Sequence, residues 1–223
     1  GTALTKKLLK TKVETIRIFS RDELKQIKMQ DELKNEKLRF LIGDIRDKER
    51  LTRAMEDIDI VFHAAALKHV PVAEYNPFEA IKTNVLGTQN VIESSLDNNV
   101  ELVLAVGTDK AVSPLNTYGA TKLLMERMIT SSNFYKGKHK TKFLCVRYGN
   151  VLGSRGSVLP KFLEQIKNNQ GLTITDPKMT RFNITMNQAI ELILRAVKFG
   201  IGGEIFVPKL KAYTVGDLKD AVM

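Results

Sequence analysis

The chain has 223 residues, of which 43% are hydrophobic and 27% charged, and its formal net charge is +10. This length suits one α/β domain with a small additional lobe, and the composition excludes a disordered chain. The apolar runs, such as IDIVFHAAAL, are shorter than the roughly 20 residues that cross a membrane, and the start, GTALTKKLLK, lacks the apolar region of a signal peptide. We therefore expect a cytoplasmic protein with no membrane span in this chain.

The positive charge raises the question of nucleic-acid binding, which requires clustered Lys and Arg. The one basic run is KGKHKTK at 136–142, which we expect to be an exposed loop before a strand. Elsewhere lysines alternate with acidic residues, as in RDELKQIKMQDELKNEKL, and this pattern is typical of solvated helix faces. Small anionic ligands account for the charge equally well, and nucleic acid is the partner class that we favour least.

Short apolar runs rich in β-branched residues alternate with longer segments of helical periodicity, which is typical of a parallel sheet with helices on both faces. The predicted strands are ETIRIFS, LRFLIGD, IDIVFHAA, VELVLAVG, TKFLCVRYG and EIFVP. The predicted helices are Ala3–Lys10, Asp22–Asn35, Asp47–Asp57, Pro77–Asn98, Asn116–Phe134, Ser157–Asn169 and Asn187–Phe199. Asn116 and Asn187 are the expected N-caps of two of them.

Residues that can carry chemistry gather where VELVLAVG leads into TDKAVSPLNTYGATK. Tyr118 and Lys122 are four residues apart on a predicted helix and therefore share a face. An ammonium beside a phenol lowers the pKa of the phenol, which would let Tyr118 accept a proton from a hydroxyl while a hydride leaves the carbon. Thr108, at the end of the preceding strand, is expected to orient the same phenol oxygen.

These residues, with FHAAALKHVP and NPFEAIKTNVLGTQNV, resemble the extended short-chain dehydrogenase/reductase family over nearly the whole chain. Within that family, TDKA followed by YGATK and RYGNVLGSRGSVLP resembles the inverting UDP-N-acetylglucosamine 4,6-dehydratases and their capsule or flagellin-glycosylation relatives. The resemblance implies a Rossmann-like, doubly wound parallel sheet with a small C-terminal substrate-binding lobe. It also implies NADP as cofactor, with NAD the weaker candidate, a UDP-sugar substrate and a homo-oligomer.

Such a sheet normally opens with a buried strand and a glycine-rich turn at a helix N-terminus. Here Gly1 directly precedes the first predicted helix, so we expect that the first strand and most of the glycine loop are missing and that Gly1 is the last glycine of that loop. We expect an NADP-binding core over 1–149 and an incomplete substrate-side segment over 150–223, interleaved with the core.

The implied reaction assigns roles to Asp109 and Lys110. After oxidation at C4 of the sugar, the C5 proton becomes acidic because the carbanion delocalises into the ketone. Lys110 is the candidate base for that proton, and a protonated Asp109 is the candidate acid for the departing C6 hydroxyl. Hydride then returns to C6, and protonation of C5 from the opposite face inverts it. The alternative is a surface turn with no chemical role.

Cofactor contacts follow from the same resemblance. Ser20, Arg21 and Lys25 suit a 2′-phosphate at a position where NAD enzymes carry an acidic residue. Asp44 and Ile45 resemble the family's adenine contacts, and Ala64 and Ala65 resemble its ribose wall. With Gly1, Tyr118 and Lys122, these complete the expected cofactor set.

Five residues are expected to contact the substrate, Arg155 and Arg181 through the diphosphate, because a guanidinium suits it. They are Lys68, Asn150, Val151, Arg155 and Arg181. A solvated loop arginine is the alternative for the last two.

Two other interpretations stay open: a different nucleotide-sugar epimerase or reductase that uses Tyr118 and Lys122 without Lys110 as base, and a non-catalytic NADP-binding module. His63, His69 and His139 show no metal-ligand spacing, so no metal is expected. His63 is expected to be structural, and Cys145 a small core residue.

Overall fold

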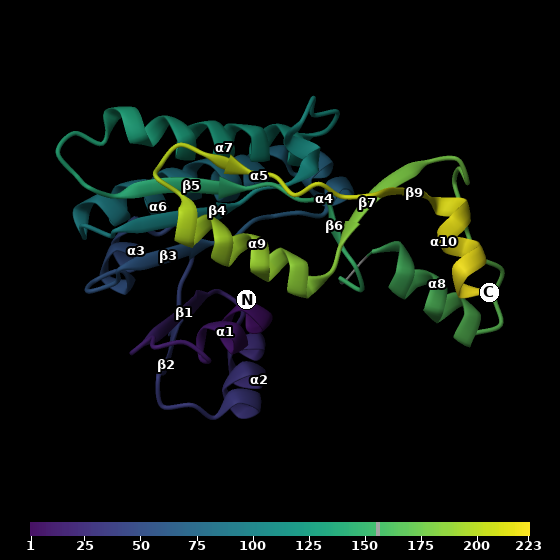
Figure 1. Cartoon of the computed structure of the whole chain (residues 1–223), viewed down its shortest axis with the longest axis horizontal. Helices are drawn as coiled ribbons and strands as arrows, with labels where there is room; N and C mark the ends of the chain where they lie inside the picture. The colour runs from purple at the N-terminus through teal and green to yellow at the C-terminus, as the bar shows by residue number, and fades with distance from the viewer. Residues whose placement is uncertain (155–156) are drawn as a thin grey trace.

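The computed structural model describes residues 1–154 and 157–223 (Figure 1). Its first half contains α1 (Thr2–Leu8), β1 (Ile16–Ser20), α2 (Glu23–Leu33), β2 (Leu38–Ile42), α3 (Lys48–Ala54), β3 (Ile60–His63), α4 (Val70–Tyr75), α5 (Pro77–Ile81), a π-helical turn (Lys82–Leu86), α6 (Gly87–Asp97) and β4 (Leu102–Val106). A 3-10 turn (Asp109–Ala111), α7 (Thr117–Tyr135), β5 (Lys142–Val146), β6 (Asn150–Val151), α8 (Val158–Lys167), β7 (Thr180–Ile184), α9 (Met186–Phe199), β8 (Ile205–Phe206), β9 (Ala212–Thr214) and α10 (Val215–Val222) follow. All six predicted strands are confirmed.

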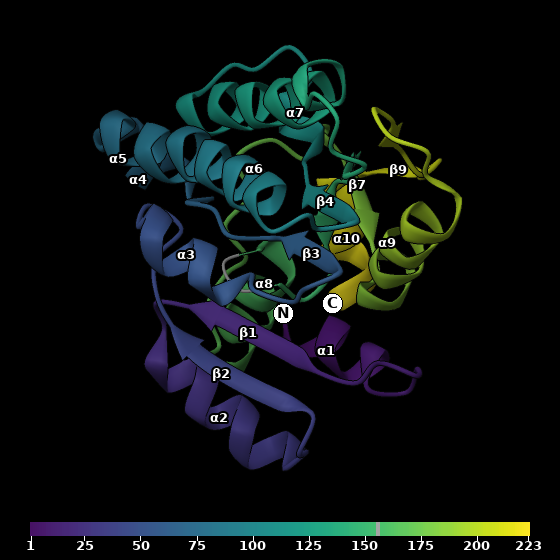
Figure 2. The ribbon, with the colours of Figure 1, turned by 90° about the vertical axis from the view of Figure 1, so that its left-hand side faces the viewer.

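The main sheet has the strand order β3-β4-β5-β8, and every pairing in it is parallel. β1 and β2 form a separate parallel pair, which lies below the main sheet in Figure 2. The third sheet has the order β6-β7-β9, parallel between β6 and β7 and antiparallel between β7 and β9. The predicted parallel α/β fold is confirmed.

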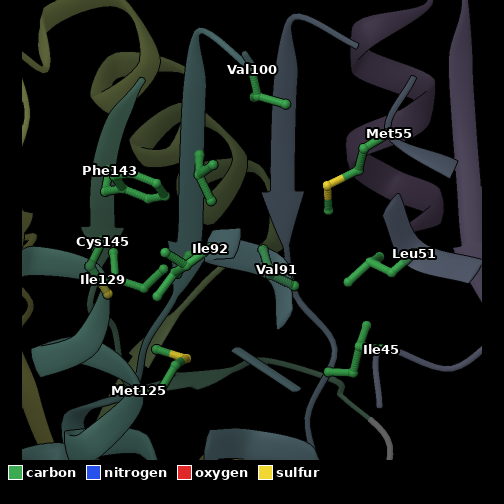
Figure 3. Close-up of a cluster of buried hydrophobic side chains, with 12 residues drawn as sticks. Ile45, Leu51, Met55, Val91, Ile92, Val100, Met125, Ile129, Phe143 and Cys145 are labelled. Atoms are coloured by element: carbon green, nitrogen blue, oxygen red, sulfur yellow. The ribbon is translucent and has the colours of Figure 1, made fainter. Parts of the chain in front are cut away.

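Helices cover both faces of the main sheet, because its buried strands alternate their side chains between two apolar clusters. On one face, Val103 and Ala105 of β4 pack with residues of α3, α6 and α7. Leu51, Val91 and Met125 of these three helices are labelled in Figure 3. On the other face, Leu102 and Leu104 pack with α9. Cys145 belongs to the first cluster, as expected, and is fully buried.

The chain after Gly149 adds a strand and a helix to the core and also forms a separate small sheet with two helices. β8 adds to the edge of the main sheet, with Cys145 opposite Ile205, and α9 covers that sheet. In contrast, β6, β7, β9, α8 and α10 lie together away from the main sheet (Figure 1). The carboxyl end of β5 therefore leads directly into this smaller sheet.

Two helix starts test the predicted N-caps. Asn116 caps α7 by accepting from the backbone N–H of Gly119, as predicted. The prediction for Asn187 is wrong: Thr185 caps α9, and the Gln188 side chain returns a bond to the Thr185 backbone. This reciprocal capping box satisfies two backbone N–H groups, and is therefore more favourable than an Asn cap, which satisfies one.

Within the described ranges, no helix is both long and apolar enough to cross a membrane.

Candidate active site

The predicted catalytic residues meet at the carboxyl ends of β4 and β5, the edge where ligands bind in open α/β sheets. Thr108 follows β4 and is buried, and its hydroxyl accepts from the backbone N–H of Lys110 at 3.4 Å. The same hydroxyl donates to Oδ1 of Asp109 at 3.0 Å. Thr108 thus caps the 3-10 turn that carries the predicted acid and base.

Asp109 and Lys110 form an ion pair. Nζ of Lys110 lies 3.1 Å from Oδ1 of Asp109 and donates to Oδ1 of Asn150 at 3.0 Å. The side chains of Lys110 and Asp109 are 37% and 36% exposed, so each is reachable from solvent while held by neighbours. Asp109 and Lys110 do lie in a turn after a strand, as the alternative interpretation expects, but their side chains are paired with each other.

Tyr118 lies beside this turn, and the expected lowering of its pKa is wrong. Burial raises the pKa of the Tyr118 phenol, and the Asp109 carboxylate raises it further, while a hydrogen bond with Thr108 opposes both. The phenol of Tyr118 therefore lies near the hydroxyl of Thr108, as the sequence predicts.

Lys122 shares the α7 face with Tyr118 but is bound elsewhere. Its ammonium donates to the backbone carbonyl of Val106 at 2.7 Å and lies 2.8 Å from Sδ of Met125. Burial lowers the pKa of Lys122 to about 8. The ammonium is therefore held at the end of β4, one turn of α7 beyond Tyr118.

Two further residues of the site escaped the sequence reasoning. Glu126, one turn beyond Lys122, is fully buried and forms a two-point ion pair with Arg147 after β5, with Nε to Oε2 at 3.0 Å. Tyr148 is half-buried: burial raises the pKa of its phenol to about 12, and the negative charge of a neighbouring Tyr118 phenolate adds to this. The spacing of Tyr118, Lys122 and Glu126 at i, i+4 and i+8 was the available signal for Glu126.

Two glycines permit the close packing of this region. A Cβ on Gly119 would overlap the backbone carbonyl of Lys110 and lie 3.0 Å from Cβ of Pro114. A Cβ on Gly149 would lie 2.5 Å from the carbonyl oxygen of Phe182. Hence the glycine of YGATK lets α7 approach the backbone of Lys110, and the glycine of RYGN lets its segment approach the backbone of Phe182. A larger residue at either position would separate the two backbones.

The loop after β3 is tied to α7 through Asn84. The buried Asn84 amide accepts from the N–H of Leu67 at 2.8 Å and donates to the carbonyl of Leu67 at 2.9 Å and to Oγ1 of Thr121 at 3.0 Å. This fixes the loop that carries the exposed Ala64, Ala65 and Lys68.

The expected cofactor residues near β1 and β2 form their own cluster. Arg21 is half-exposed and lies 3.2 Å from Oδ2 of Asp44. Ser20 accepts from the N–H of Asp22, and Lys25 pairs with the Asp22 carboxylate. Ile45, which follows Asp44, is buried in the core cluster, where it packs against the position of Gly87. Gly1 is the N-cap of α1, and its carbonyl accepts from the N–H of Thr5.

Substrate candidates after Gly149 line the small sheet. Asn150 and Val151 form β6, and Asn150 is paired in register with Asn183 of β7. Arg181, two residues before Asn183, donates to its neighbour's carbonyl at 2.9 Å and lies opposite Tyr213 of β9. Asn150, Arg181 and Asn183 therefore share one face of this sheet. Arg155 lies outside the described residues.

His63 is structural in its contacts. It is buried, its Nε2 is 2.9 Å from Oγ1 of Thr88, and burial, reinforced by the charge of Lys122, lowers its pKa to about 3. Over residues 1–154 and 157–223, no group of three His, Cys, Asp or Glu side chains is arranged to hold a metal ion.

A parallel α/β sheet with Thr108 at the end of a central strand, and Tyr118 and Lys122 on the helix that follows, is the arrangement of the extended short-chain dehydrogenase/reductase class. The chain belongs to the polysaccharide biosynthesis protein family, whose model matches residues 1–223.

Relatives match the whole chain. A protein of Methanocaldococcus jannaschii described as an uncharacterized membrane protein is 53% identical over 223 residues, and an inverting UDP-N-acetylglucosamine 4,6-dehydratase of Campylobacter jejuni is 48% identical over 224 residues. A UDP-glucose 4-epimerase of Rickettsia bellii is 46% identical over 226 residues. The chain spans 67% of the length of the first two and 66% of the third.

A solved structure agrees closely with the fold. The X-ray structure of Pen from Bacillus thuringiensis superposes with a TM-score of 0.96 at 49% identity, over 99% of this chain and 70% of the other. The chain is thus a member of a family of nucleotide-sugar dehydratases and epimerases.

Proposed function

We propose that the chain is the catalytic part of an NADP-dependent UDP-N-acetylglucosamine 4,6-dehydratase that inverts C5. The observation that carries this proposal is the ion pair of Asp109 and Lys110, with 3.1 Å between Oδ1 and Nζ, beside the phenol of Tyr118. A dehydratase needs an acid and a base in addition to the tyrosine that serves oxidation at C4. The 48% identity to the Campylobacter jejuni dehydratase over the whole chain supports the same reaction.

In this proposal Tyr118 takes the proton of the C4 hydroxyl, oriented by Thr108. For the elimination the proton shared by the Asp109–Lys110 pair lies on Asp109. Lys110, as a neutral amine, then takes the C5 proton, and Asp109, as a carboxylic acid, gives its proton to the C6 hydroxyl, which leaves as water. C5 is then reprotonated from the opposite face. Two protons are taken from the sugar and two are returned, one with the leaving water and one to C5, so the protein ends in its starting protonation state after internal transfer.

Residues that follow β1 and β3 fit a nicotinamide dinucleotide. Small, exposed Ala64 and Ala65 follow β3, and the half-exposed guanidinium of Arg21 follows β1. A bound nicotinamide would accept the C4 hydride and return a hydride to C6. Arg21, with Ser20 and Lys25, is the proposed contact of a 2′-phosphate, which favours NADP over NAD.

Sugar-nucleotide contacts are proposed for the small sheet and the loop after β3. Arg181 suits the diphosphate, and Lys68 lies exposed beside the alanines. Residues 1–149 would then bind the dinucleotide, while 150–223 contribute the substrate side.

A UDP-sugar 4-epimerase is the second candidate, favoured by the 46% identity to the Rickettsia bellii protein of that name. An epimerase oxidises C4 and returns hydride to the same carbon, so it needs Tyr118 without a base for C5.

The Lys110→Ala variant separates the two functions. For a dehydratase we expect elimination of water from UDP-N-acetylglucosamine to be lost while slow oxidation at C4 remains. Lys48→Ala is the matched control, because the Lys48 ammonium pairs with Glu93 and Asp97 of α6 and lies outside the catalytic cluster. Interconversion of C4 epimers that survives in Lys110→Ala would instead establish the epimerase.

A further inference from the structure

The ammonium of Lys110 has two acceptors of different kinds. One is the carboxylate of its neighbour, Asp109, at 3.1 Å, and the other is the amide oxygen of Asn150 at 3.0 Å. Asn150 lies 40 residues further along the chain, at the start of β6. Since the lysine stem has several rotatable bonds, a second, distant anchor restricts the amine far more than the neighbouring carboxylate alone.

The segment that brings Asn150 to this point is itself fixed. The N–H of Asp109 donates to the carbonyl of Tyr148 at 3.1 Å. Gly149 allows the contact to continue, because a Cβ there would lie 3.2 Å from Oδ2 of Asp109. Three consecutive residues therefore pack against the Asp109–Lys110 turn. Tyr148 accepts a hydrogen bond through its carbonyl, Gly149 leaves room because it has no side chain, and Asn150 accepts through its side-chain amide.

β6 is held from its other side as well. Asn150 is in parallel register with Asn183, and the N–H of Leu152 donates to the carbonyl of Ile184 at 2.9 Å. Asn183 in turn donates to the Tyr213 hydroxyl. The amide oxygen of Asn150 is therefore presented by a strand of the small sheet and not by a free loop.

We propose that Asn150 is a positioning residue that fixes the Lys110 amine in the orientation needed to remove the sugar C5 proton, rather than a residue that only contacts substrate. This inference rests on the proposed function for the role of Lys110, while the contact itself does not. A neutral amide suits this role because it accepts a hydrogen bond from the amine. Unlike a second carboxylate, it adds no negative charge that would hold the proton on the ammonium.

The test uses the full chain with three substitutions. Asn150→Leu removes the acceptor while keeping the number and branching of the side-chain heavy atoms. Asn150→Asp keeps an acceptor oxygen but adds charge, and Asn183→Leu makes the same change as the first variant on the same sheet face without touching Lys110. The first readout is the rate at which an amine-reactive acylating reagent labels Lys110, measured by peptide mass spectrometry. This readout needs no turnover.

We expect Lys110 to be labelled about tenfold faster in Asn150→Leu, the effect of losing one hydrogen bond to a charged group. Asn150→Asp and Asn183→Leu should not be labelled faster than the unsubstituted chain. Equal labelling of Lys110 in Asn150→Leu and the unsubstituted chain would overturn the proposal. Equally fast labelling in Asn183→Leu would also overturn it, because the effect would then come from loosening of the sheet.

The second readout is incorporation of solvent deuterium at C5 of UDP-N-acetylglucosamine as a function of pH. We expect about tenfold slower exchange in Asn150→Leu, and an acid limb moved to higher pH in Asn150→Asp, because the added carboxylate favours the ammonium. Asn183→Leu should keep the shape of the pH profile. An unchanged profile in both Asn150 variants overturns the positioning role. If labelling responds but the unsubstituted chain exchanges no deuterium, the proposed function fails and the anchoring of the amine stands.

Discussion

The ammonium of Lys122 donates a hydrogen bond to the backbone carbonyl of Val106 across 2.7 Å and so fastens α7 to the last residue of β4. This contact keeps a lysine in a nearly water-free position, 3% exposed. Its charge is therefore costly in the folded chain, and the pH dependence of stability should report it.

Lys122→Met should remove a rise in stability with alkaline pH. Burial lowers the folded pKa of Lys122 to about 8 from the ordinary 10.5, so between these values the unfolded chain binds more protons. The Lys122 contribution to the free energy of unfolding therefore increases as pH rises from about 8 to 10.5. Urea unfolding of both chains at several pH values measures the difference, and parallel curves for the two chains would contradict a lowered pKa of Lys122.

Gly119→Ala should destabilise the chain and disturb the site. The added Cβ would overlap the carbonyl of Lys110, so α7 must move away from the turn that carries Asp109. We expect a loss of ~1–3 kcal/mol in the free energy of unfolding, typical of overpacking. Gly171→Ala is the control, since nothing lies within 4 Å of a Cβ there. Equal unfolding free energies for the two variants would show that α7 and the turn are not in tight contact.

The predictable part of this molecule is the part with local periodicity. The strands of the main sheet, Thr108, and the shared face of Tyr118 and Lys122 follow from strand composition and helical spacing. The bond between Lys122 and Val106 does not, because it depends on how α7 packs over the sheet.

The small sheet was missed for a different reason. β6 has two residues and β9 three, too few for an alternation to show. The partner of Lys110 at Asn150 lies in this sheet and is set by tertiary packing alone. The Thr185 cap, in contrast, was readable, since Gln188 stands at the third position of a capping box.

Glu126→Gln should cost stability because it leaves the Arg147 guanidinium without its charged partner. The Glu126 side chain is 2% exposed and that of Arg147 22%, and breaking a pair with a buried partner costs about 3 kcal/mol. The double variant with Arg147→Met should recover part of this loss. Thermal or urea unfolding of the four chains forms a double-mutant cycle, and purely additive effects would mean that the pair contributes no coupling.

Arg21→Ser should weaken NADP⁺ binding about tenfold and leave NAD⁺ binding nearly unchanged, as expected for the loss of one hydrogen bond between charged groups. The Arg21 guanidinium follows the carboxyl end of β1 and pairs with Asp44. Because it is half-exposed, it can also donate to a phosphate there. Arg53→Ser, in the last turn of α3, is the control. Calorimetric titration with both dinucleotides measures the two affinities, and equal weakening of both would exclude a specific 2′-phosphate contact.

The most direct test is incubation of the chain with UDP-N-acetylglucosamine and catalytic NADP⁺, followed by mass spectrometry and by NMR of C5. We predict a product lighter by one water molecule, with C5 inverted and the cofactor returned to its oxidised form. A product of unchanged mass that differs only at C4, or no product despite dinucleotide binding, would contradict the assignment of Lys110 and Asp109 as base and acid.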